Sequence, residues 1–319
     1  MKQISLTTTG FELNAKPARK HVFPEEMNHV APWADLVALI TPHAPASKTG
    51  HLSFADSSTL RNRFLQPWLS QSDWSIEKTV HDVSQRRQFA DFDARLTQLP
   101  DESTVSSFWL FLKGHNLSAR LLGTINDILT ARGLLLKNRS RLDPMLIAAP
   151  SSTNHQSGER HLEVHQKKKG NHLYFDIKAN VGVAADSGLV CAVAATAQNP
   201  KDAMQVHSLL HSEDAVMLNE ADYQVWAKRP EATGVARQIA MHPSKRRALP
   251  DTPWNHPGEK IENVKPAIRA KVHDSFWVIK RKFGLIKLRY RFLRKSTAQL
   301  LTFFALYNLR MVQKTLKEE

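Results

Sequence analysis

Lysine and arginine residues concentrate in one stretch near the C-terminal end of the sequence, and phosphate binding is the chemistry that they offer. Residues 265–295 contain eleven basic residues and one acid, Asp274, a net charge of +10 within a formal net charge of +14 for the 319 residues. The run VIKRKFGLIKLRYRFLRK interleaves the cations with Phe283, Tyr290 and Phe292. Cations neutralise phosphates and aromatic side chains stack on bases. The pattern favours nucleic-acid binding, although a solvated helix face gives the same run of charges.

Few other residues are arranged for chemistry. Cys191 is the one cysteine, which excludes an internal disulfide and a multi-cysteine metal site. His161 and His165 have the spacing of one helix face, but they lie in a polar stretch, and we do not predict a metal site there. The basic residues 167–169 are expected either near a phosphate backbone or at a solvated hairpin tip.

Composition sets the class of protein that must position these residues. Hydrophobic residues make up 42% and charged residues 23%, as in an ordinary globular protein, which excludes wholesale disorder. The longest apolar run, residues 298–309, is shorter than the roughly 20 residues of a bilayer span. The first residues lack the apolar core of a signal peptide. We therefore expect a cytoplasmic protein with no membrane partner.

Hydrophobic spacing divides the sequence into a helical first part and a mixed second part. Residues from Pro32 to about Gly133 have helical periodicity, and Gly114, His115 and Asn116 form a turn between two of the helices. Such a turn is compatible with a helix-turn-helix and equally with any helical hairpin. Strands are expected at residues 145–149, 172–185, 188–196, 215–218 and 235–241, and helices at residues 199–211, 261–282 and 296–317. This order predicts an α/β fold with a mixed sheet.

Three interrupted strings carry a resemblance to a known family. The first runs from APSST at residues 149–153 through HQ at 165–166 and KKGN at 168–171 to SGL at 187–189. The second is Ala221 with Tyr223 and Gln224, and the third is IRAKVHDSFWVIKRKFGLIKLRY at 268–290. In this order the strings resemble DDE transposases of the bacterial insertion sequence 5 family.

The resemblance implies a fold, a reaction and a set of partners. It implies a helical N-terminal DNA-binding region at residues 1–135 and a ribonuclease-H-like mixed-sheet domain at residues 136–319, ending in basic helices. In such a domain three carboxylates bind two divalent cations, here Mg²⁺, which activate the attacking oxygen and stabilise the leaving oxygen. The partner is double-stranded DNA at the terminal inverted repeats of an element. Self-association on DNA and a nucleoid-associated location are also implied.

The three acid positions of the resemblance fall on Asp143, Glu220 and His273. Asp143 is intact, but Pro144 follows it, and a proline inside a strand predicts local distortion. Glu220 keeps the charge on a side chain one methylene longer. His273 stands between Arg269 and Lys280 where the family has glutamate, and histidine is a poorer Mg²⁺ ligand than carboxylate. Asp274 is a candidate metal ligand together with Asp143 and Glu220, although neighbours on a helix point about 100° apart.

The basic run and the Lys167–Lys169 loop give the candidate DNA contacts, and the resemblance leaves the function open between two readings. The candidate contacts are Lys167, Lys168, Lys169, Arg269, Lys280, Arg281, Lys282, Lys287, Arg289 and Arg291. With one acid lost, we expect a transposase that cleaves and transfers DNA strands poorly or not at all. The alternative is a non-catalytic DNA-binding relic or domesticated protein of the same fold. A basic membrane-surface or RNA-binding protein is a third, weaker hypothesis.

Overall fold

The computed structural model describes the helical part of the chain, a sheet and the C-terminal helices. The described residues are 26–44, 54–92, 99–136, 139–148, 166–169, 172–197, 216–219, 236–239, 270–287 and 293–318. The helices before the sheet are α2 (Trp33–Ile40), η1 (Thr41–His43), α3 (Asp56–Trp68), α4 (Asp73–Asp82), α5 (Ser84–Phe89), α6 (Glu102–Gly114) and α7 (Leu117–Ala131). Residues 26–30 form a further helical turn.

Polar side chains cap two of these helices. The hydroxyl of Ser72 accepts a hydrogen bond from the Ser75 N–H at 3.1 Å and begins α4. The carboxylate of Asp101 accepts from the Thr104 N–H at 2.8 Å and begins α6. Hydrogen bonds from Thr104 and Ser103 lower the pKa of Asp101. Both caps satisfy donors that a helix leaves free in its first turn, so the sequence fixes these two starting points locally.

The sheet is mixed. Its strands are β1 (Arg139–Ala148), β2 (Gln166–Lys169), β3 (His172–Ala184), β4 (Val190–Ala197), β5 (Val216–Asn219) and β6 (Ala236–Ile239). β3 lies antiparallel between β1 and β4, while β5 runs parallel to β1 and β6 parallel to β5. β2 pairs with the first residues of β3. The three antiparallel strands therefore continue into two parallel ones on the far side of β1.

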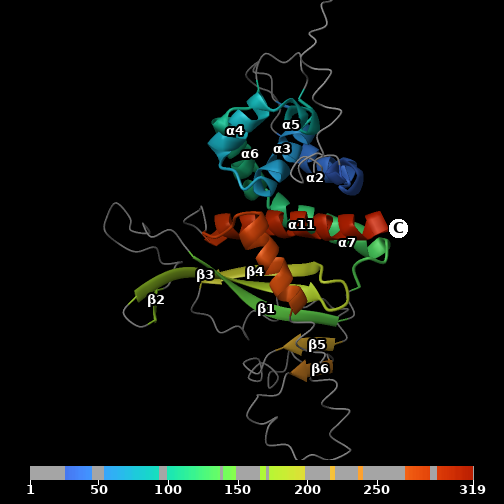
Figure 1. The fold of residues 1–319 in the computed structure, drawn as a ribbon, viewed down its shortest axis with the longest axis vertical. Coiled ribbons are helices and arrows are strands. Elements are labelled where there is room, and N and C mark those ends of the chain that lie inside the picture. Colours follow the sequence, from blue (N-terminus) through green and yellow to red (C-terminus); the bar gives the residue numbers. More distant parts are fainter. Residues whose placement is uncertain are drawn as a thin grey trace, which may run out of the picture.

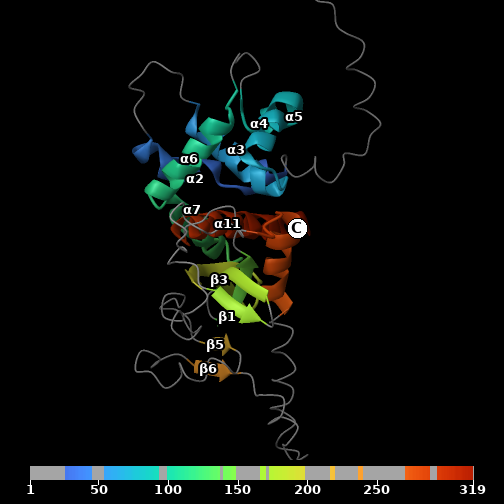
Figure 2. The ribbon, with the colours of Figure 1, turned by 90° about the vertical axis from the view of Figure 1, so that its left-hand side faces the viewer.

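The long helix α11 (Leu293–Glu318) lies between the N-terminal helices and the sheet (Figure 1). It packs beside α7 and against β4, and it also contacts α3 and α6. Figure 2 shows the same three levels after a quarter turn: N-terminal helices, then α7 with α11, then the sheet. One continuous hydrophobic core runs through these levels.

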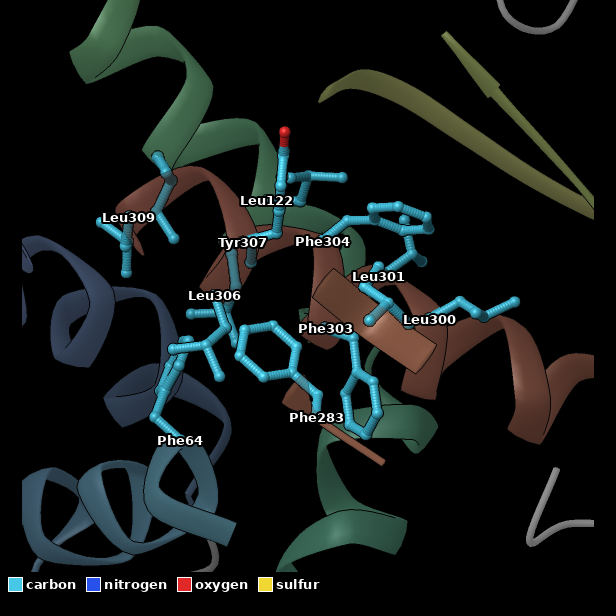
Figure 3. Packing of buried hydrophobic residues seen from close by; sticks show 14 of the residues in the cluster. Phe64, Leu122, Phe283, Leu300, Leu301, Phe303, Phe304, Leu306, Tyr307 and Leu309 are labelled. Carbon is cyan, nitrogen blue, oxygen red and sulfur yellow. The ribbon is translucent and has the colours of Figure 1, made fainter. Parts of the chain in front are cut away.

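Aromatic residues of α11 fill the centre of this core. Phe303, Phe304 and Tyr307 are buried, and Phe283 lies beside Phe303 with ring centroids 6.1 Å apart (Figure 3). Phe64 of α3 belongs to the same cluster. Burying an aromatic side chain removes a large apolar area from water. The helix that the sequence placed at 296–317 is therefore the central element of the fold.

Most elements expected from the sequence are confirmed within the described residues. The strands expected at 172–185 and 188–196 are β3 and β4, joined by a short turn in which Gly188 has φ +74°. The helical hairpin around Gly114, His115 and Asn116 is α6 with α7. Because α7 is buried against α11 and Asn126 of α7 donates to the Val190 and Cys191 carbonyls of β4, α7 forms part of the core, which favours a plain helical hairpin over a helix-turn-helix. The helix expected at 199–211 lies outside the described residues.

The distortion expected at Pro144 is not found in the strand pairing. The antiparallel register of β1 with β3 runs unbroken from Ser140 opposite Ala184 to Ala148 opposite Asp176. On the other side of β1 the described pairing with β5 ends at Arg141. A strand accepts proline where its missing N–H faces no ladder partner. The prediction of a distorted strand was therefore wrong for the β1–β3 pair.

Candidate active site

The site is built around the segment 270–287, which begins as an α-helix over residues 270–277 and continues as the π-helical turn η5 (Val278–Lys282). Val272, Phe276 and Ile279 are buried on one side of it. His273, Trp277 and Arg281, each four residues apart, are exposed on the other side. Helical periodicity explains this division, and it places His273, where the resemblance implies the third acid, on the solvent-facing side.

Contacts at its two ends hold this segment along β1. Near its start, the Lys271 ammonium donates to the carbonyl oxygens of Ala185 at 2.9 Å and Asp186 at 2.6 Å, just after β3. At its end, the backbone of Lys287 bridges that of Ala148, the last residue of β1. Because Ser140 near the start of β1 pairs with Ala184, the segment touches the sheet at both ends of β1.

The π-turn is fixed by a contact from the N-terminal helices. The Ser70 hydroxyl donates to the carbonyl oxygen of Lys282 at 3.0 Å. Gly284 has φ +68°, and a Cβ there would lie 2.8 Å from Cβ of Ser70. Trp68 lies against Phe283 with ring centroids 5.9 Å apart. The end of α3 therefore determines where the basic turn stops.

The strands place the first acid position and lead to the second. Asp143 lies in the middle of β1, with its backbone opposite Val181 of β3. Leu218 of β5 pairs with Arg141, and β5 ends at Asn219. Glu220 is the next residue in the chain and lies outside the described residues.

His273 and Asp274 are exposed neighbours on the helix, but they differ in surroundings. The His273 ring lies edge-on to Phe276 with centroids 6.0 Å apart. Asp274 acts instead on Tyr307 of α11: burial, and secondly the Asp274 carboxylate, raises the pKa of that phenol. The negative charge of Asp274 therefore influences a residue of α11.

A comparison with known protein families identifies the family of this chain. The family described as "Transposase DDE domain" matches residues 142–309, more than half of the chain, from β1 into α11. The chain belongs to the transposase DDE domain family. No solved structure matches it.

Membership in this family indicates a transposase function with DNA as the substrate. Transposases with a DDE domain generally use a divalent metal, typically Mg²⁺. None of the described helices is long and apolar enough to cross a membrane.

The donors at the three acid positions that the resemblance implies do not match a pair of Mg²⁺ ions well. Hard Mg²⁺ prefers oxygen ligands, and the third position offers an imidazole. Among the residues that the structure describes, no group of three histidine, cysteine or carboxylate side chains could hold a metal ion.

The candidate DNA contacts of the DDE domain fall into three sets. Lys280 is half-buried, and Arg281, Lys282 and Lys287 are exposed on the segment along β1. Lys167, Lys168 and Lys169 form most of β2, where they pair with Tyr174, Leu173 and His172 of β3. Arg269, Arg289 and Arg291 lie outside the described residues. The structure joins Lys287 to Ala148, which lies opposite Asp176 of β3, and the β2 lysines pair with the residues of β3 directly before Asp176.

Sequence reasoning missed the residues that position this segment. Lys271 entered the sequence analysis only as one charge in a basic run, whereas it anchors the helix on two backbone carbonyls. Ser70 and Lys282 are 212 residues apart, and neither a motif nor a spacing connects them. The glycine at 284 was the one signal available, since glycine is the residue that adopts positive φ without cost.

Proposed function

We propose that this chain is a transposase of the insertion sequence 5 type that binds double-stranded DNA at the terminal inverted repeats of its element. The observation that carries the proposal is the family match from β1 to α11. The mixed sheet, with three antiparallel strands continued by two parallel ones, supports a ribonuclease-H-like fold for residues 136–319. Residues 1–135 are the proposed helical DNA-binding region, although α7 shares its core with α11.

The strand register supports a shared site for the first two acids. β5 is parallel to β1, and its pairs advance one residue at a time from Arg139 with Val216 to Arg141 with Leu218. We propose that Glu220, the next residue in the chain after β5, shares a site with Asp143 of β1.

We propose that cleavage is impaired because His273 occupies the third acid position. A neutral imidazole gives the second cation no negative charge, and an imidazolium repels it. Asp274 does not replace the missing acid simply, since neighbours on a helix point about 100° apart. Small displacements of a catalytic group reduce rates strongly, so the longer side chain of Glu220 adds to the loss.

A non-catalytic DNA-binding protein of the same fold is the second candidate. The loss of the third carboxylate favours it, and the retained Asp143 and Glu220 favour a weakened enzyme. The DNA that flanks the gene separates the two: matching inverted repeats indicate a mobile copy, and their absence indicates a relic or a domesticated binder. Self-association on DNA and a cytoplasmic, nucleoid-associated location belong to both versions.

The DNA-binding part of the proposal is tested at η5. Replacing Lys280, Arg281 and Lys282 by alanine should weaken duplex binding and flatten the slope of log affinity against log salt by up to ~3 units. The charge-retaining change of Lys280 and Lys282 to arginine is the control and should leave the slope unchanged. An unaltered slope in the alanine variant would show that these three residues do not contact phosphate.

A further inference from the structure

Trp277 is a large apolar side chain on the exposed side of the segment along β1. It is 52% exposed, although its neighbours Phe276 and Val278 are both buried. It lies four residues after His273 and four before Arg281, on the same face as both. An indole held in water beside a proposed active site costs stability, and large exposed apolar groups commonly mark an interaction surface.

The π-turn places a cation on this indole. The Lys282 ammonium lies 5.3 Å from the centroid of the Trp277 ring. In an α-helix a residue five positions on is rotated by about 140°, whereas in a π-helix the i→i+5 pair is one turn apart. The change to η5 at Val278 therefore brings Lys282 over Trp277.

Contacts on the buried side of the π-turn fix the positions of Trp277 and Lys282. Ser70 fixes the carbonyl of Lys282, and Gly284 closes on Ser70. Phe283, the next residue, is buried between Trp68 and Phe303. Because the turn is fixed on its buried side, Trp277 and Lys282 are presented without a large loss of freedom on binding.

We propose that Trp277, with Lys282 and Arg281, is a stacking site for the unpaired bases of a DNA strand. The proposal rests on the DNA-binding function proposed above and names the form of DNA that this face prefers. An indole stacks on the flat face of a base, which a duplex hides and an unpaired strand exposes. The two cations hold the adjacent phosphates. Exposed Ile286 and Lys287 extend the same segment to Ala148, the last residue of β1.

A second exposed tryptophan provides a matched control. Trp74 of α4 is 55% exposed, and the Lys78 ammonium lies 3.9 Å from its ring centroid. Its helix also carries Asp73, Glu77 and Asp82, so its surroundings are acidic rather than basic. The two sites share the tryptophan–lysine pair and differ in the charge around it. A negatively charged nucleic-acid strand is therefore expected to bind at Trp277, with its basic surroundings, and not at Trp74, with its acidic ones.

The test compares Trp277→Ala and Trp74→Ala of the full chain on a single-stranded oligothymidine and on a duplex of equal length, by fluorescence anisotropy. Trp277→Ala should weaken single-strand binding by about 5- to 100-fold and change duplex binding by less than about twofold. Trp74→Ala should change neither. Trp277→Phe should recover part of the single-strand affinity, which separates stacking from misfolding.

The following results would overturn this assignment. Equal losses from the two tryptophan variants would show a general effect of removing an exposed indole. Equal losses on single strand and duplex would make Trp277 an ordinary backbone contact. Altered self-association with unchanged DNA binding would assign the face to a second copy. If the unaltered protein binds neither form of DNA, the proposed function fails as well, whereas salt-dependent duplex binding with no effect of Trp277→Ala contradicts this inference alone.

Discussion

Two neighbouring regions differ in where their polar side chains lie. One is the junction of α7, α11 and β4, and the other is the segment 270–287. At the junction, fully buried Asn308 accepts from the Val190 N–H at 2.8 Å and donates to the Val190 carbonyl at 2.8 Å. It also donates to Asn126 of α7 at 2.8 Å. On the segment, His273, Trp277 and Arg281 face water. The first region is built to hold one packing, and the second is built to meet something outside the protein.

The largest effect is expected from breaking the buried junction. Asn308→Ala leaves the Val190 N–H and the Asn126 side-chain oxygen without their partner in a site closed to water, which should lower the free energy of unfolding by about 4 kcal/mol. Urea denaturation measures it. Thr297→Ala is the control on the same helix, because its hydroxyl bonds only to the Leu293 carbonyl four residues back, and it should cost less than ~1 kcal/mol. Equal losses of unfolding free energy in the two variants would mean that the buried hydrogen bonds of Asn308 add no more stability than an ordinary hydrogen bond within a helix.

A smaller effect is expected where the exposed segment meets the N-terminal helices. Gly284→Ala combines a positive φ with a Cβ 2.8 Å from Ser70 and should cost about 2–3 kcal/mol. Gly133→Ala, with φ +71° and nothing within 4 Å, should cost only about 1 kcal/mol. Gly114→Ala, with neither feature, should be near neutral. If the Gly284 and Gly133 variants had equal unfolding free energies, the close contact with Ser70 would not contribute to the cost.

This gradation also shows what the sequence could and could not predict. The β3–β4 hairpin, α6, α7 and α11 follow from local periodicity and turn residues. The strand at β1 was expected only from residue 145, because Arg139, Arg141 and Asp143 break its apolar run, while the structure begins it at Arg139. The Ser70–Lys282 and Asn126–Asn308 contacts join residues more than 180 positions apart, and no local pattern encodes them.

The candidate site was less predictable than the fold. The identity of Asp143 and His273 as site positions came only from the resemblance, since no spacing joins a strand residue to a helix 130 residues later. The π-turn at residues 278–282 was not expected, because its sequence VIKRK reads as ordinary helix. The π-turn depends on tertiary contacts of Ser70 with Lys282 and of Phe283 with the core.

The smallest stability effect is expected at Tyr307, where the two regions touch. Its hydroxyl donates to the Gly188 carbonyl at 3.0 Å, and Tyr307→Phe should cost about 1 kcal/mol. Burial raises the pKa of Tyr307, so the folded protein keeps a proton that the unfolded chain releases above the ordinary value of 10.0. This contribution is complete below pH 10 and falls by up to about 1.4 kcal/mol per pH unit above it. Alkaline urea titrations should show a shallower decline in Tyr307→Phe than in the unaltered protein, and parallel declines would contradict this reading.

The central claim is that the exposed segment carries a transposase site that has lost its third carboxylate. The most direct measurement is the nicking of a supercoiled plasmid that carries the element's ends, with Mg²⁺ and with Mn²⁺. Little or no nicking is expected from the unaltered protein, and partial rescue is expected from His273→Glu, with a further increase when Glu220→Asp is added. Robust nicking by the unaltered protein that disappears in Asp143→Ala would contradict it, because His273 or Asp274 would then serve as a working ligand.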